Sequence, residues 1–404
     1  MTNEDAAIKV IELLRDKGFQ ALLAGGCVRD MLLDRDAKDY DVVTNAIPKD
    51  VIRLFKRTIK IGAHFGVIMV MLDDQRIEVA TFRSDGGYED GRHPASVEFV
   101  DAKQDALRRD FTINGMFYDT VKDKVIDYVN GQADLKKQVI RTIGEPQKRF
   151  DEDYLRMLRA VRFSTQLKFK IEPKTWQGIK GSAKKISKIS GERISMEIES
   201  ILIDPNRSLG SAMLVKSGLA QAIFPDFDNE QGKFAIKVLA ELRKKVNYPL
   251  ALAALFAACL THFALDKCVI LMLSRNQNKH IKFLLSNRGK LINEKISLAD
   301  LKQIASEPYF RDLYELQKTI QIAAGQSTDA LTKLNRRLEE LGDIELRPDP
   351  LLNGHELIRA GATPGPVLGQ LAEEMYIAQL EGKLQGKEMA QKWVEIWLEQ
   401  HKQK

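Results

Sequence analysis

The sequence predicts an α+β fold, in which a mixed α/β head of about 145 residues precedes an all-helical remainder. Short apolar strand patterns separated by turns fill residues 21–130. From about residue 150 onward, nearly every segment has the periodicity of a helix, with breaks at Pro173, Gly191, Pro205 and Pro225. A chain of 404 residues is too long for one ordinary core, so we expect two to four domains.

The head elements follow one another in a simple order. An amphipathic helix comes first, and a short strand then ends at a glycine pair that opens a second helix. A buried strand and an alternating strand form a hairpin around Asp73-Asp74, and a polar loop precedes one more strand. These elements are expected at residues 1–20, 21–24, 28–33, 66–72, 76–83, 84–94 and 97–100.

Composition limits the class of protein. Lysine and arginine number 62 against 56 acidic residues, and this mildly basic balance permits nucleic-acid binding without requiring it. The three cysteines have no regular spacing, so we expect neither a disulfide framework nor a zinc site, and a reducing cytoplasm fits. The apolar stretch 249–265 carries Thr261 and His262 and is typical of a buried helix rather than a membrane span. The polar N-terminus does not resemble a signal peptide.

The first candidate site is a glycine turn close to two aspartates. Gly25 and Gly26 lie between a strand and a helix start, where free backbone N–H groups can face a phosphate. Asp39 and Asp41 precede Val42-Val43 in a predicted strand, so their side chains are expected on one face. Two such carboxylates suit Mg²⁺ bridging nucleotide phosphates. The other interpretation is a surface turn with two solvated acids.

Glu78 is a candidate third acid. It lies on the strand 76–83 and, in the hairpin, is expected to face the same way as Asp39 and Asp41. A pair of metal ions about 3.5–4 Å apart usually shares carboxylates. A solvent-facing strand glutamate explains the pattern equally well. Arg83 on the same strand either contacts a phosphate or pairs with an acid.

Two further motifs combine arginines with an acid. Arg108-Arg109-Asp110 adjoins apolar residues, which favours arginines held ready for a triphosphate and an acid beside a ribose hydroxyl over a solvated helix end. Arg156, Arg159 and Arg162 are spaced three apart and form a stripe on a predicted helix, with Asp153 one turn before it. An Asp and an Arg together offer an acceptor and a donor to the edge of cytosine or adenine. An exposed helix with salt bridges is the alternative.

Taken together, these segments resemble the class II tRNA nucleotidyltransferases, which comprise CCA-adding enzymes, their CC-adding and A-adding relatives, and bacterial poly(A) polymerases. The resemblance rests on the glycine turn with Asp39-x-Asp41, on Arg108-Arg109-Asp110 and on Glu152-Asp153-x-x-Arg156, which occur in the family's order. It implies a polymerase-beta-like nucleotidyltransferase head with a mixed sheet, followed by a helical neck, body and tail. The segment Gly191 to Glu197 is similar to the family's next motif.

The resemblance also implies roles for these residues. Asp39 and Asp41 hold Mg²⁺ and, with Glu78, form the catalytic set. Gly26, Arg29 and Arg109 contact the phosphates, Asp110 contacts the ribose, and Asp153 and Arg156 select CTP or ATP without a nucleic-acid template, with Arg159 and Arg162 behind them. The acceptor is the 3′ end of tRNA, and no obligate protein partner is evident. The implied parts are a catalytic head, a base-recognition neck, a body and a tRNA-binding tail at residues 1–145, 146–225, 226–345 and 346–404.

The resemblance leaves more than one enzyme subtype possible, which differ in the nucleotides that they add. A full-length loop at residues 84–94 favours complete CCA addition or A addition over CC addition, and the segment 61–67 lacks the basic character expected of poly(A) polymerases. A-only addition, CC-only addition, poly(A) synthesis and a non-catalytic RNA-binding protein with a degenerate head remain the alternatives.

Overall fold

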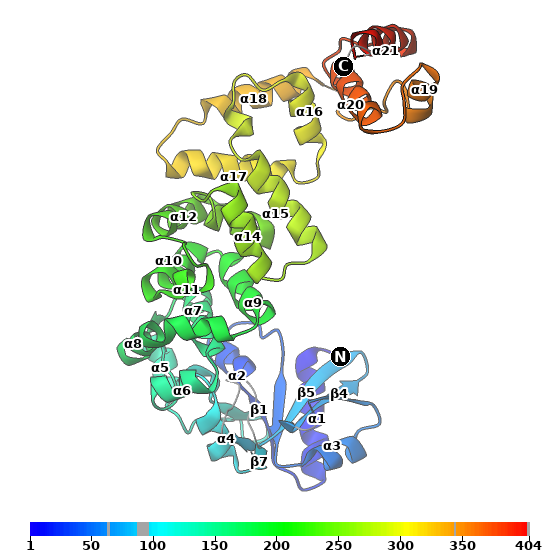
Figure 1. Cartoon of the computed structure of the whole chain (residues 1–404). Coiled ribbons are helices and arrows are strands. Elements are labelled where there is room, and N and C mark those ends of the chain that lie inside the picture. Colours follow the sequence, from blue (N-terminus) through cyan, green and yellow to red (C-terminus); the bar gives the residue numbers. More distant parts are fainter. Residues whose placement is uncertain (63–64, 87–96, 343–344, 402–404) are drawn as a thin grey trace. The chain divides into compact units, whose positions relative to one another are not determined.

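The computed structural model describes residues 1–62, 65–86, 97–342 and 345–401. The chain forms two compact units, Met1–Lys233 with Ile270–Met272, and Phe234–Val269 with Leu273–Lys404. Strands gather at the start of the chain, and helices make up the rest (Figure 1). The predicted α+β class is therefore confirmed, whereas the division into head, neck, body and tail stays a prediction.

A seven-stranded mixed sheet forms the centre of the first unit. Its order is β3-β4-β5-β2-β1-β8-β9, and within it β2 runs parallel to β5 while the other neighbours are antiparallel. The strands span, in order of number, Ala21–Ala24 (β1), Asp41–Thr44 (β2), Thr58–Gly62 (β3), Val67–Leu72 (β4), Gln75–Thr81 (β5), Phe117–Asp119 (β8) and Lys124–Ile126 (β9). The β4–β5 pair confirms the predicted hairpin.

The helix α1 (Asn3–Asp16) explains why the sheet is buried on one side. A capping box between Thr2 and Asp5 starts the helix, and its apolar stripe, which includes Val10 and Leu14, is fully buried. It packs against β1, β2 and β5, while α3 (Pro48–Leu54) packs against β4 and β5 (Figure 1). Because β1 lies between two strands inside this layer, all four of its residues are buried.

Two predictions for the head need correction. The strand β2 begins at Asp41, so Asp39 lies in the irregular segment before it and not on the strand. The predicted loop at 84–94 begins with the strand β6 (Arg83–Asp85), which pairs with β7 (Val97–Phe99). The remainder of that loop, and residues 63–64 of the segment 61–67, lie outside the described residues.

The remaining elements of the first unit are mostly helical. One exception to the predicted all-helical remainder is β11 (Lys170–Ile171), which pairs in parallel with β10 (Val139–Ile140). The helices are α2 (Gly26–Met31), α4 (Ala102–Arg108), α5 (Gly131–Lys137), α6 (Pro146–Glu152), α7 (Leu155–Leu167), α8 (Pro173–Ser182), α9 (Gly191–Leu202), α10 (Arg207–Ser217), α11 (Leu219–Ile223) and the start of α12 (Asn229–Glu241), with 3₁₀ turns η2 (Thr112–Asn114) and η3 (Ala183–Lys188).

The second unit is helical in its described residues. The stretch 249–265 is not one buried helix as predicted, because α13 ends at Leu255 and α14 begins at Thr261. No described helix is long and apolar enough to cross a membrane. The elements are α13 (Tyr248–Leu255), α14 (Thr261–Ile270), α15 (Arg275–Asn287), η4 (Lys290–Ile292), α16 (Leu298–Ser306), α17 (Phe310–Ala323), α18 (Asp329–Glu340), α19 (Gly354–Arg359), α20 (Pro366–Leu380) and α21 (Lys387–His401).

Two clusters hold the second unit together. A break that contains Pro348 and Pro350 separates α18 from α19, and beyond it Leu357, Met375 and Trp397 share an apolar core. Before the break, Asp312 on α17 is nearly buried, accepts hydrogen bonds from Asn247 at 2.5 Å and from Arg243, and lies 3.3 Å from His280. Burial alone would raise the pKa of Asp312, but these donors lower it to about 2.

Replacing this carboxylate should destabilise the second unit. Since the folded-state pKa of Asp312 is depressed, the stabilisation is present above the unfolded pKa and is lost as pH falls toward 2. We expect Asp312→Asn to lower the unfolding free energy by about 2 kcal/mol at pH 7, with the difference shrinking between about pH 4 and pH 2. Urea unfolding followed by circular dichroism measures both. Glu294→Gln, which breaks an exposed ion pair with Lys333, is the control and should cost under about 0.5 kcal/mol.

Candidate active site

A cleft of about 1040 Å³ lies within the first unit and gathers the candidate residues. Its lining comes from β2 and β5 of the sheet and from α2, α7 and α9. Each candidate nucleotide-binding, catalytic or metal-binding residue from the sequence lines this one cleft: Gly25, Gly26, Arg29, Asp39, Asp41, Glu78, Arg109, Asp110, Asp153, Arg156, Arg159 and Arg162. Residues up to 137 positions apart are thus brought together, although their roles stay predictions.

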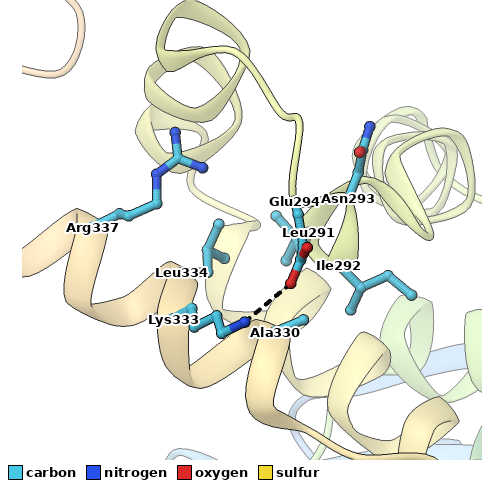
Figure 2. Close-up of a pocket in the computed structure, with 8 residues that line it drawn as sticks. All are labelled: Leu291, Ile292, Asn293, Glu294, Ala330, Lys333, Leu334 and Arg337. Carbon is cyan, nitrogen blue, oxygen red and sulfur yellow. Dashed lines mark hydrogen bonds and ion pairs between the residues drawn. The ribbon is translucent and has the colours of Figure 1, made fainter.

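A smaller pocket in the second unit has far fewer ionisable side chains in its lining. It measures about 240 Å³ and lies between η4 and α18 (Figure 2). Lys333 and Glu294 form an ion pair of 3.1 Å across it, and Leu291 and Leu334 line it. Its lining contains one carboxylate, and that carboxylate is already paired, so the large cleft is the better candidate for a reaction site.

The acidic side of the cleft follows from the pairing of β2 with β5. Val42 lies opposite Val79, so Asp41, the first residue of β2, is a neighbour of Glu78 in the middle of β5. Burial and then the charge of Glu78 raise the pKa of Asp41 to about 6, which Arg109 partly offsets. Burial likewise raises the pKa of Glu78. Part of the shift in the pKa of Asp41 comes from repulsion between its charge and that of Glu78. A cation bound between the two carboxylates would remove that repulsion.

Oxygen ligands of this kind fit Mg²⁺. Asp39 contributes to the same field, because its charge also raises the pKa of both Asp41 and Glu78. Among the described residues, however, no three acid, histidine or cysteine side chains are arranged to hold one ion. The magnesium site on Asp39 and Asp41, and Glu78 as a possible further ligand, therefore stay predictions.

The glycine turn has the geometry that the sequence predicts. Gly25 joins β1 to α2 with φ +77°, a conformation that favours glycine. A Cβ at this position would approach Nη1 of Arg109 to 3.3 Å, so the missing side chain also makes room for that guanidinium. Arg109 in turn stacks over the ring of Phe117, with 5.0 Å between the guanidinium carbon and the ring centroid.

Asp105 organises the arginine pair and was missed by the sequence analysis. Its side chain is fully buried and accepts from Nη2 of Arg108 at 2.7 Å and from Nη2 of Arg109 at 3.0 Å. Although burial opposes ionisation, the charges of Arg109 and Arg108 hold the pKa of Asp105 below its usual value. An aspartate three and four residues before two adjacent arginines at the end of a helix was the available signal.

The carboxylate of Asp110 is engaged by Arg159. Nη2 and Nε of Arg159 donate to it at 2.6 and 2.8 Å, and its own neighbour Phe111 donates a backbone N–H at 2.8 Å. Burial alone would raise the pKa of Asp110, but the charges of Arg159 and Arg156 lower it. The predicted ribose contact would therefore have to share this carboxylate with Arg159.

The predicted base-reading pair is present but differs from the expected helix stripe. Asp153 is not on α7, because it is the extended residue that caps the end of α6, and its carboxylate accepts the backbone N–H of Leu155 at 3.0 Å. Nη2 of Arg193 donates to Asp153 at 2.7 Å. Arg156 is 9% exposed rather than on an open face, since Glu152 and the carbonyl of Arg149 accept from its guanidinium.

Phe163 is a second residue that the sequence analysis missed. The guanidinium carbons of Arg29, Arg159 and Arg162 lie 5.3, 5.3 and 4.2 Å from its ring centroid. One aromatic ring thus attracts three cations that would otherwise repel each other in the cleft. Arg162 is further held by Glu197 at 2.7 Å. A phenylalanine directly after an arginine stripe gives little signal in the sequence, because it is equally typical of a core residue.

The comparisons with known proteins define the class. Residues 21–141 match the family model described as "Poly A polymerase head domain", and residues 168–231 match "Probable RNA and SrmB- binding site of polymerase A". These matches cover the mixed sheet and the helices that follow α7. The first unit thus contains the head of a polymerase-type nucleotidyltransferase.

Relatives that match nearly the whole chain identify the family within this class. CCA-adding enzymes of Lactobacillus johnsonii and Enterococcus faecalis are each 33% identical over 396 residues, which covers 95% of this chain and 95% and 93% of theirs. The crystal structure of the Bacillus stearothermophilus CCA-adding enzyme in complex with CTP is similar with a TM-score of 0.80 at 28% identity, covering 100% of this chain and 99% of that one. The chain belongs to the family of CCA-adding enzymes, which confirms the predicted family.

Replacing Asp105 should destabilise the folded protein more than replacing Asp101, the exposed N-cap residue of the same helix. Asp105→Ala leaves two largely buried guanidinium groups without their shared carboxylate, so we expect a loss of about 3 kcal/mol in unfolding free energy. Asp101, the N-cap of α4, accepts from Gln104 at 2.8 Å, and Asp101→Ala should cost about 1 kcal/mol. Urea unfolding compares the two variants, and equal losses would contradict the role given to Asp105.

Proposed function

We propose that this protein is a tRNA nucleotidyltransferase that adds C and A residues to the 3′ end of tRNA from CTP and ATP, without a nucleic-acid template. The observation that carries the proposal is that one cleft holds the acids beside β2, the arginines beside the glycine turn, and the Asp153 and Arg156 pair. Relatives named CCA-adding enzymes, one of them solved with CTP, support it. The three buried, free cysteines suit a cytoplasmic enzyme.

The arginine side of the cleft would bind the triphosphate. Arg29 is aimed by Asp30, which accepts at 2.8 and 2.9 Å, and by the side-chain oxygen of Asn114, which accepts at 2.8 Å. Arg109 is fixed by Asp105 and lies against the glycine turn. Guanidinium groups held in this way bind phosphate oxygens without first losing conformational freedom.

The part of the cleft around Asp153 and Arg156 would select the base. Asp153 offers an acceptor and Arg156 a donor, which suits the amino group and the ring nitrogen that cytosine and adenine both present. Arg193 and Glu152 already hold these two side chains, so their positions are defined before a nucleotide arrives. Uracil and guanine present the opposite pattern on this edge and would leave buried polar groups unpaired.

In the proposed reaction, the 3′-terminal hydroxyl of tRNA attacks the α-phosphorus of the bound nucleotide, and pyrophosphate leaves. Asp39 and Asp41, with Glu78 as a candidate third acid, would hold Mg²⁺, which when bound stabilises the charge on the attacking and departing oxygens. The guanidinium groups of Arg29 and Arg109 would balance the charge of the leaving pyrophosphate. We further propose that residues 346–404 form the tRNA-binding tail of the predicted four-part chain.

The activity is tested by incubating the protein with CTP, ATP, Mg²⁺ and a tRNA that lacks its last three nucleotides. Sequencing of the 3′ ends distinguishes complete CCA addition from A-only, CC-only or poly(A) products, and we expect CCA. Absence of any addition would favour the alternative of a non-catalytic RNA-binding protein with a degenerate head. The acids that face one another across β2 and β5 favour catalysis over that alternative.

Neutralising one acid should abolish nucleotide addition. We expect Asp41→Asn to lower kcat/KM for CTP and ATP by at least about a hundredfold, because the charge that would attract the metal is reduced. Asp74→Asn, in the turn between β4 and β5 and away from the cleft lining, is the control and should retain full activity. Wild-type turnover of Asp41→Asn in folded protein would rule out the proposed catalytic role.

Removing the ring of Phe163 should weaken nucleotide binding. Each contact of a cation with an aromatic ring contributes about 0.5–1 kcal/mol, so Phe163→Leu is expected to raise KM for CTP and ATP by about tenfold, with a smaller change in kcat. Phe163→Tyr keeps the ring and should behave as wild type. Steady-state kinetics measure both, and a tyrosine variant as impaired as the leucine variant would show that packing alone is responsible.

A further inference from the structure

Arg149 lies beside the cleft without lining it, and it contacts the segments that surround the proposed base-reading arginine. It belongs to α6, three residues before Glu152, and its side chain is 18% exposed. It is absent from the described lining of the cleft, as is Glu152, so neither side chain is positioned to touch a nucleotide there. Its effect on the reaction would therefore have to pass through other residues.

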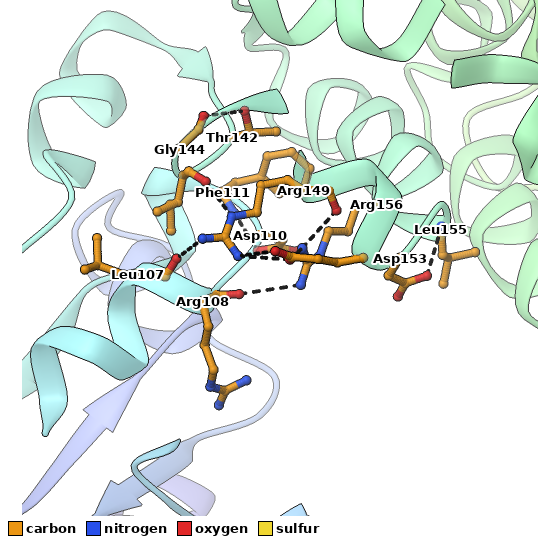
Figure 3. Close-up of polar contacts among 12 residues, drawn as sticks. Leu107, Arg108, Asp110, Phe111, Thr142, Gly144, Arg149, Asp153, Leu155 and Arg156 are labelled. Atoms are coloured by element: carbon orange, nitrogen blue, oxygen red, sulfur yellow. Dashed lines mark hydrogen bonds and ion pairs between the residues drawn. The ribbon is translucent and has the colours of Figure 1, made fainter. Parts of the chain in front are cut away.

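One guanidinium group joins three separate pieces of chain (Figure 3). Nε of Arg149 donates to the carbonyl of Ile143 at 2.7 Å, and Nη2 donates to the carbonyl of Leu107. Nη1 donates to both carboxylate oxygens of Glu152, at 2.9 and 3.1 Å. The carbonyl of Leu107 belongs to the last turn of α4 and has no partner within the helix, so an outside donor is needed there.

Glu152 carries the connection on to Arg156. Its Oε2 accepts from Nη1 of Arg149 and also from Nη1 of Arg156. The backbone carbonyl of Arg149 accepts from Arg156 at 2.9 Å, and the carbonyl of Arg108 lies 3.5 Å from Nη2 of Arg156 (Figure 3). The Arg156 guanidinium is therefore held by the main chain of Arg149, the main chain of Arg108 and the carboxylate of Glu152.

The same contacts fix the segment Arg108-Arg109-Asp110. Leu107 directly precedes it, so the hydrogen bond from Arg149 holds the start of this segment while Glu152 holds Arg156. In the proposed function, that segment would grip phosphate and ribose, and Arg156 would read the base. A base can be discriminated only when the reading group keeps a fixed position relative to the sugar and phosphates, and misplacement by about 1 Å is costly.

We propose that Arg149 is a positioning residue that sets nucleotide selectivity by fixing Arg156 relative to the Arg108-Arg109-Asp110 segment. This inference rests on the proposed function. Lysine cannot take the place of Arg149, because a single ammonium group lacks the planar fork that reaches two carbonyls and a carboxylate at once. A purely structural role predicts instead that all nucleotides are affected alike.

The experiment measures kcat/KM for CTP against UTP and for ATP against GTP, with tRNA ending where each nucleotide is due. We expect Arg149→Met and Arg149→Lys to lower both ratios by about tenfold, chiefly because UTP and GTP are rejected less well. Lys148→Met, an exposed residue of the same helix, is the matched control and should keep both ratios. Thermal midpoints establish that the variants are folded.

Glu152→Gln provides a second variant that keeps the size of the side chain and removes the bridging charge. It should lower both ratios in the same direction, and the double variant with Arg149→Met should lose less than the two single losses combined, because both act through Arg156. If Arg149→Met does not fold, the CTP-to-UTP and ATP-to-GTP ratios of Glu152→Gln test the positioning role instead.

Two results would overturn the inference: unchanged ratios in the folded Arg149 and Glu152 variants, or full recovery of selectivity in Arg149→Lys. A wild-type protein that adds neither C nor A would instead refute the proposed function itself. A wild-type protein that adds A alone still permits the test, with the ratio of ATP to GTP as the readout. Failure of the positioning role is thus distinguishable from failure of the activity.

Discussion

The cleft depends on pairing buried guanidinium groups with carboxylates of the same unit. Taking an arginine out of water is costly unless an anion accepts its protons, and the groups that would meet a triphosphate lie in largely buried positions. The pairs are Arg29 with Asp30, Arg108 and Arg109 with Asp105, Arg149 and Arg156 with Glu152, Arg159 with Asp110, Arg162 with Glu197, and Arg193 with Asp153. Because these pairs form without a ligand, the positive charges are oriented before any nucleotide binds.

The local parts of this arrangement are readable from the sequence. A glycine pair between a strand and a helix, an alternating strand after a two-residue turn, and arginines next to apolar residues each follow from rules that act over a few positions. The structure places these features as expected, with Gly25 at φ +77° and the β4–β5 hairpin in register. The parallel pairing of β2 with β5, which sets Glu78 beside Asp41, joins strands separated by other elements and had to be seen in the fold.

The partners that hold the site were not predictable, for a physical reason. The ion pair of Arg193 with Asp153 spans 40 positions and that of Arg162 with Glu197 spans 35, so no spacing rule connects them. The prediction that Asp153 shares a helix with the arginine stripe was wrong for a different reason. Its side chain accepts the N–H of Leu155 and so competes with continuous helix between α6 and α7, a tendency of aspartate that helical periodicity alone does not reveal.

Carboxylates in and beside the cleft have pKa values shifted in opposite directions, and the difference lies in their neighbours. Burial raises the pKa of Asp41 to about 6 with help from the charge of Glu78, whereas arginines hold the pKa of Asp105 and Asp110 low. The arginine side keeps its positive groups in place with the protein's own carboxylates, whereas the side formed by β2 and β5 carries an excess of negative charge. A triphosphate without a cation would be attracted to the first side and repelled by the second. Binding across the whole cleft thus favours a nucleotide that is accompanied by a divalent cation.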